Sequence, residues 1–152
     1  MPANELREKP RQTVRIIASI AAVIWAIVIF ILSAIPASGY PPHPGFLNYV
    51  AHFFEYAIFA VLLTLAINSP RRALWKTAVI AMLIASLYAI TDELHQYLAN
   101  LYFDSGRHGD PVDWLTDTVG AIVGAGATIW FISSRKVKSS RAKDAKRKAK
   151  GQ

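Results

Sequence analysis

Seven polar residues that could do chemistry interrupt or border the apolar segments of this chain. They are one histidine, one glutamine and five acids: His52, Gln96, Glu55, Asp92, Glu93, Asp113 and Asp117. Carboxylates beside an imidazole can transfer protons as general acids and bases, or bind a divalent metal ion. Because charged groups inside apolar segments cost free energy, their placement is the best indicator of function.

Helical spacing sorts these residues into stripes, because residues three or four apart lie on the same face of a helix. The stripes are His52, Glu55 and Tyr56; Asp92 and Gln96 with Glu93 beside them; and Asp113, Asp117, Gly120 and Gly124. Gly120 and Gly124 form a small-xxx-small pair, which lets a second helix approach closely. Frequent small residues in membrane helices would explain the pair equally well.

The elements that carry the stripes are four apolar segments, at roughly 16–35, 50–67, 76–97 and 114–132. Each is about long enough to cross a hydrocarbon core of roughly 30 Å as a helix. The chain is 53% hydrophobic over 152 residues, too apolar for a soluble domain of this size. We therefore predict an all-α membrane protein, a bundle of four transmembrane helices. The chain has no cysteine, which excludes disulfides and thiolate metal sites.

The basic residues predict the orientation. They gather before the first segment, between the second and third, and after the fourth, whereas Arg107 lies in the loop at the opposite end. The positive-inside rule then places both termini in the cytoplasm. We expect a basic cytoplasmic N-terminus at 1–15, a membrane domain at 16–132 and a disordered polybasic cytoplasmic tail at 133–152. The tail suits anionic membrane lipids, and no nucleic acid partner is expected.

This topology brings the three stripes together in one layer near the outer face, with Arg107 in the loop above. Five carboxylates in a partly dry layer cannot all be ionised without compensating cations. Three interpretations remain open: a structural polar network closed by Arg107 and His52, a pocket that binds or converts a ligand, and a metal site. For the metal site the oxygen ligands favour Mg²⁺, Ca²⁺ or Mn²⁺, and adding His52 allows Zn²⁺. Its candidate ligands are Glu55, Glu93, Asp113 and Asp117.

For the pocket we expect Glu93 to act as general base or acid, with Asp92, His52 and Glu55 as its catalytic neighbours. The Arg107 guanidinium would hold an anionic head group. The other expected ligand-binding residues are Gln96, Tyr56, Asp113 and Asp117. A divalent metal ion is the cofactor that these residues suggest.

Four motifs in order resemble the VanZ-like family of bacterial integral membrane proteins. They are Ser33-x-x-Pro36, His52-Phe-x-Glu55-Tyr56, Asp92-Glu93-x-x-Gln96, and Gly106-Arg107-x-Gly109-Asp110-x-x-Asp113-x-x-x-Asp117-x-x-Gly120-Ala121. The resemblance runs from about residue 33 to 124. It implies a multi-pass protein of the bacterial cytoplasmic membrane with a role in the cell envelope. The family is linked to resistance to the glycopeptide antibiotic teicoplanin.

The resulting hypothesis is a protein that binds or modifies a membrane lipid or a lipid-anchored amphiphile at the extracytoplasmic face. The resemblance supplies no reaction, so whether the protein is an enzyme stays open. One alternative is a small transporter or an ion- or proton-coupled protein. Another is a non-enzymatic membrane assembly factor whose polar residues only organise its helices.

Overall fold

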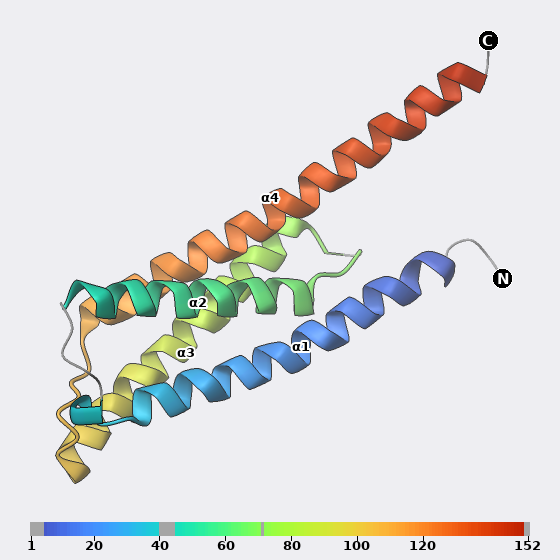
Figure 1. Ribbon diagram of the computed structural model, residues 1–152. Coiled ribbons are helices and arrows are strands. Elements are labelled where there is room, and N and C mark those ends of the chain that lie inside the picture. Colours follow the sequence, from blue (N-terminus) through green and yellow to red (C-terminus); the bar gives the residue numbers. More distant parts are fainter. Residues whose placement is uncertain (1–4, 40–44, 71, 151–152) are drawn as a thin grey trace.

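The structure, a computed structural model, describes residues 5–39, 45–70 and 72–150, which form four long helices and no strand (Figure 1). They are α1 (Glu5–Ala34), α2 (Phe46–Ile67), α3 (Leu74–Phe103) and α4 (Pro111–Lys150), with a short 3-10 helix η1 (Ala37–Gly39) after α1. All four are long and apolar enough to cross a membrane. The predicted fold class, an all-α bundle of four transmembrane helices, is confirmed.

Several helix boundaries differ from those of the expected segments, and local capping explains two of them. Helix α3 continues to Phe103. The next residue, Asp104, adopts a left-handed conformation (φ 49°), and its N–H donates a hydrogen bond to the Asn100 carbonyl. Helix α4 begins at Pro111, and the Asp110 carboxylate accepts a hydrogen bond of 2.8 Å from the Val112 N–H. An aspartate N-cap followed by proline is a favourable helix start. The loop between α3 and α4 is therefore shorter than the expected loop at 98–113.

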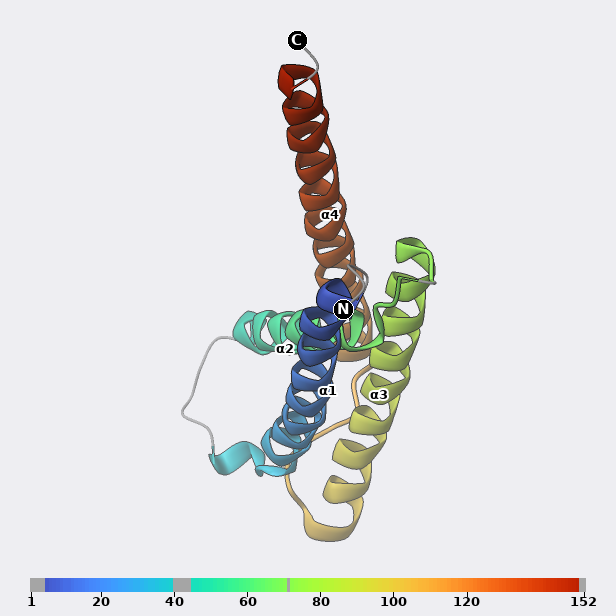
Figure 2. The same ribbon diagram turned by 90° about the vertical axis from the view of Figure 1, so that its right-hand side faces the viewer.

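The tail that was expected to be disordered is helical as far as Lys150, where α4 ends. Its alanines, lysines and arginines are good helix formers. At 40 residues, α4 is about 60 Å long, roughly twice the thickness of a hydrocarbon core. Its basic end extends beyond the other helices in both views (Figures 1 and 2). The division of the chain into cytoplasmic ends and a membrane domain stays a prediction.

The start of α1 and the end of α4 lie toward the same end of the bundle (Figure 1). The other end collects the last turn of α1, the first turns of α2 and α4, and the last turns of α3. An even number of spans requires this arrangement. Which end faces the cytoplasm stays a prediction, based on the basic residues.

The core of the bundle is built mainly from small residues, with Ile29, Tyr56 and Phe59 among the few large side chains buried in it, whereas most large apolar side chains point outward. Ala85, Ala89 and Ala121 are fully buried, while Ile17 and Leu87 are 61% and 63% exposed. A soluble protein would expose a much smaller continuous apolar surface. In lipid this pattern is expected, because close backbone packing rather than burial of large side chains holds membrane helices together. The chain is therefore a multi-pass membrane protein.

Helix α2 packs against each of the other three helices, and its contact with α4 is the most extensive. Gly120 and Gly124 of α4 lie directly against the backbone carbonyls of Phe53 and Ala57 in α2. A Cβ atom at either glycine would overlap that carbonyl. The two glycines thus set both the distance and the register between α2 and α4.

Replacing Gly124 with alanine should destabilise the bundle, because the added methyl group overlaps the Ala57 carbonyl. We expect a loss of about 1–3 kcal/mol, seen as a lower midpoint of thermal unfolding in detergent. Gly126→Ala is the matched control, since a Cβ there would meet no atom within 4 Å. The midpoint of thermal unfolding of Gly126→Ala should stay unchanged or rise, because alanine favours the helix more than glycine does. Equal losses in the two variants would contradict the close approach of α2 and α4.

Candidate functional site

The polar residues singled out above come together at the end of the bundle that collects the first turns of α2 and α4 and the last turns of α3. Helix α2 supplies His52 and Glu55, α3 supplies Asp92, Glu93 and Gln96, and α4 supplies Asp113 and Asp117. Arg107 comes from the loop between α3 and α4. The helical stripes therefore share one region, which divides into a buried cluster and a cavity.

His52 is the centre of the buried cluster. Its Nδ1 lies 3.0 Å from Asp117 Oδ1, and its Nε2 lies 3.8 Å from Asp113 Oδ2. Asp113 also accepts hydrogen bonds of 3.3 and 3.2 Å from the Asn48 amide. Exposure is 6% for His52, 5% for Asp113 and 0% for Asp117. A chain of polar contacts thus connects the start of α2 with the start of α4.

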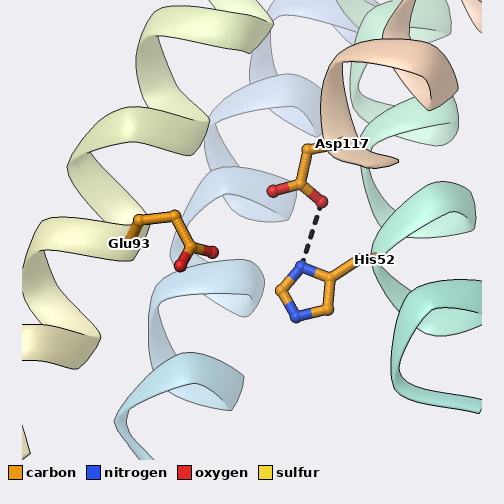
Figure 3. A group of neighbouring side chains, drawn as sticks. All are labelled: His52, Glu93 and Asp117. Carbon is orange, nitrogen blue, oxygen red and sulfur yellow. Dashed lines mark hydrogen bonds and ion pairs between the residues drawn. The ribbon is translucent and has the colours of Figure 1, made fainter. Parts of the chain in front are cut away.

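Glu93 joins the same cluster from α3, and its carboxylate lies across from Asp117 and His52 (Figure 3). Its Oε2 accepts a hydrogen bond of 2.6 Å from the backbone N–H of Asp110. The loop reaches Glu93 closely because Gly109 has no side chain: a Cβ there would lie 2.8 Å from the Glu93 carbonyl oxygen. His52, Glu93 and Asp117 each offer one potential metal-ligand atom, and these three atoms lie within 4.8 Å of one another.

Beside this cluster is a cavity of about 310 Å³ between α1, η1, α2, α3 and the loop that joins α3 to α4. Its polar lining residues are Ser33, Asn48, His52, Glu55, Asp92, Gln96 and Arg107. Its apolar lining residues are Leu32, Ala37, Leu47 and Ala51. The cavity therefore offers hydrogen-bond donors, acceptors, both signs of charge and hydrocarbon in one wall.

Gln96 and Arg107, two further lining residues, are also held by specific contacts. The Gln96 amide donates to Asp92 Oδ2 at 3.3 Å, one turn away on α3. Arg107 donates from Nε to the Ile35 carbonyl at 3.0 Å and from Nη2 to the Leu32 carbonyl at 3.3 Å. These carbonyls belong to the last turn of α1 and the residue that follows it, where helix carbonyls lack partners within the helix. Arg107 thus fastens the loop to the end of α1.

The structure places the expected site residues in two groups. His52, Glu55, Asp92, Gln96 and Arg107 line the cavity, whereas Glu93, Asp113, Asp117 and Tyr56 do not. Only His52 takes part in both the cavity wall and the cluster. Glu93, expected as the general acid or base, faces His52 and Asp117 instead of the cavity. The roles assigned to these residues stay predictions.

Sequence reasoning did not assign Asn48 or Ser33 to the site, although Ser33 belongs to the Ser33-x-x-Pro36 motif. Asn48 lies one helical turn before His52, so the same spacing rule that grouped His52 with Tyr56 could have found it. Ser33 comes from α1, which has no charged residue near its end, so only the Ser33-x-x-Pro36 motif could have indicated that this helix forms a wall of the cavity. Ser33 Oγ lies 3.2 Å from His95 Nδ1, which joins α1 to α3.

Four buried oxygen atoms in this region have no hydrogen-bond partner among the described residues: Tyr56 Oη, Asp92 Oδ1, Glu93 Oε1 and Asp117 Oδ2. Buried polar atoms in folded proteins are nearly always bonded, since an unmet one costs about 1–3 kcal/mol. The site therefore has spare capacity to accept donors or a cation.

Removing His52 should destabilise the protein strongly, because Asp113 and Asp117 would lose the imidazole between them. We expect His52→Leu to cost about 3–5 kcal/mol in the free energy of unfolding, measured in detergent with a chelator present. Adding Asp117→Asn should recover part of the loss by removing one uncompensated charge. The control is His108→Leu, at an exposed loop histidine. If the double variant is no more stable than His52→Leu, the imidazole does not compensate Asp117.

A comparison with protein families agrees with the resemblance seen in the motifs. The family model described as VanZ/LLP1 matches residues 9–132, which include every residue of the cluster and the cavity wall. Searches of curated proteins and of solved structures found no match to this chain. Since the family model spans most of the sequence, including all four apolar segments, the chain belongs to the VanZ/LLP1 family.

Proposed function

We propose that this protein is a bacterial cytoplasmic-membrane protein of the cell envelope that binds the head group of a membrane amphiphile in the cavity. The observation that supports this most directly is the mixed lining, which combines charged and amide side chains with leucines. A lipid or lipid-anchored molecule has the same division into a polar head and an apolar tail.

The size of the cavity suits a head group. Its volume of about 310 Å³ lies at the lower end of the range for small-molecule pockets, roughly 300–1,000 Å³. A whole lipid would not fit, so the tail would lie along the outer surface. Leu47 provides the route, because it lines the cavity and is also 42% exposed at the outer surface of the bundle.

The polar lining indicates which head groups fit. The carboxylates of Glu55 and Asp92 accept hydrogen bonds from hydroxyl or ammonium groups, while the amides of Asn48 and Gln96 both donate and accept. Arg107 adds positive charge at the same wall and favours a phosphate or carboxylate. A head group with hydroxyls or an amine next to an anionic group would satisfy all of them.

Binding is proposed without a reaction, because the acid expected to act as general base or acid is not in the cavity wall. Transport is less well supported than binding. A transporter site usually lies near the midplane between broken helices, whereas the four helices here are unbroken.

Filling the cavity should displace the bound amphiphile. We expect Ala51→Trp protein, purified from native membranes in a mild detergent, to retain at least about tenfold less of the specific lipid seen by native mass spectrometry. That decrease corresponds to about 1.4 kcal/mol. Ala127→Trp is the matched control, because Ala127 is an exposed alanine on α4 outside the cavity. Equal retention by the Ala51→Trp and Ala127→Trp proteins would overturn the proposal, as would wild-type protein that carries only bulk lipid.

A further inference from the structure

We propose that His52, Glu93 and Asp117 bind one divalent transition-metal ion at the junction of α2, α3 and α4. This site differs from the amphiphile cavity, since Glu93 and Asp117 do not line the cavity and only His52 belongs to both. It can be tested whether or not the protein binds a lipid.

The geometry is close to that of a metal centre. The three residues come from three helices and direct their side chains toward a common point (Figure 3). Their potential ligand atoms already lie within 4.8 Å of one another. Bonds of about 2.0–2.2 Å to nitrogen and oxygen would bring such atoms to roughly 3–3.5 Å apart, which needs only small side-chain movements.

The unpartnered oxygens are an independent indication of a ligand. Asp117 is 0% exposed, yet its Oδ2 has no hydrogen-bond partner among the described residues. Glu93 Oε1 is also buried and has no hydrogen-bond partner among the described residues. Glu93 Oε2, in contrast, accepts the hydrogen bond from the Asp110 N–H. A cation between these two carboxylates would supply the missing partner for both oxygens at once.

The surrounding contacts resemble the outer shell of a metal site. A metal-bound histidine usually donates its second ring N–H to a carboxylate, which fixes the ring orientation. With His52 Nδ1 directed at the ion, its Nε2 faces Asp113 Oδ2 at 3.8 Å. Asp113 is itself held by the Asn48 amide. The ion would take the place of the proton that Nδ1 and Asp117 now share at 3.0 Å.

The ligand set selects the class of metal. One imidazole and two carboxylates suit Zn²⁺ or Mn²⁺, whereas Mg²⁺ and Ca²⁺ prefer oxygen ligands alone. Two positive charges would also balance the two carboxylates inside a region of low dielectric constant. The competing explanation is a protonated His52 paired with Asp117 and Asp113, which needs no metal and predicts no metal affinity.

The test is a titration of the purified full-length chain, free of affinity tags and stripped with a chelator, with Zn²⁺ and with Mn²⁺. Isothermal calorimetry should show one ion per chain for the wild type. Asp113→Asn should weaken affinity roughly tenfold to a hundredfold, as outer-shell changes do. Glu93→Gln and Asp117→Asn should weaken it more.

Asp104→Asn is the matched control, since Asp104 is an exposed acid outside both the cluster and the cavity wall, and asparagine tolerates its left-handed conformation. Its affinity should equal that of the wild type. Co²⁺ in place of Zn²⁺ adds a spectroscopic reading: its visible absorption should report nitrogen and oxygen ligands and should disappear in Glu93→Gln protein. Because Asp117→Asn protein could fold poorly, Glu93→Gln and Asp113→Asn carry the test in that case. A folded wild type that binds neither Zn²⁺ nor Mn²⁺, or equal losses in Asp104→Asn and Glu93→Gln, would overturn the proposal.

Discussion

The contact between two glycines of α4 and the backbone of α2 is the constraint on which the site depends. Gly120 rests on the Phe53 carbonyl, and Phe53 immediately follows His52. Asp117 lies three residues before Gly120 on the same helix face. The backbone contact that brings α2 and α4 together therefore also places His52 beside Asp117. Without that closeness the imidazole and the carboxylate could not lie 3.0 Å apart.

Four of the five acids in the site are each stabilised by a different neighbour, which explains how these carboxylates share a small volume. Asp117 has the His52 ring, Asp113 the Asn48 amide, Asp92 the Gln96 amide, and Glu93 a backbone N–H. Three of these four donors are neutral. Arg107, whose charge was expected to close the network, uses two of its nitrogens to hold the end of α1. It helps to shape the cavity as well as to charge it.

The sequence predicted the elements and their polar faces well, because both depend on local rules. Lengths of apolar segments give the four helices, and helical spacing gives the stripes around His52, Asp92 and Asp117. The separation into a cavity and a buried cluster could not be predicted, since it depends on which way Glu93 turns. Its direction is decided by the Asp110 N–H, seventeen residues later in the chain. The Ser33-x-x-Pro36 motif marked the end of α1, but its role as a wall of the cavity could not be predicted, because the helix contributes Leu32, Ser33 and backbone carbonyls and no charged side chain.

Helix α4 runs without interruption from Pro111 to Lys150, so one rigid rod carries Asp113 and Asp117 at one end and the basic residues at the other. When one end of a straight helix tilts, the other end moves with it. Any force that draws the basic end toward a charged bilayer surface would pivot the helix about its glycine contacts with α2. The acids near Pro111 would then move in the opposite direction. The lipid composition of one membrane surface would thus affect the positions of these acids at the opposite end of the bundle.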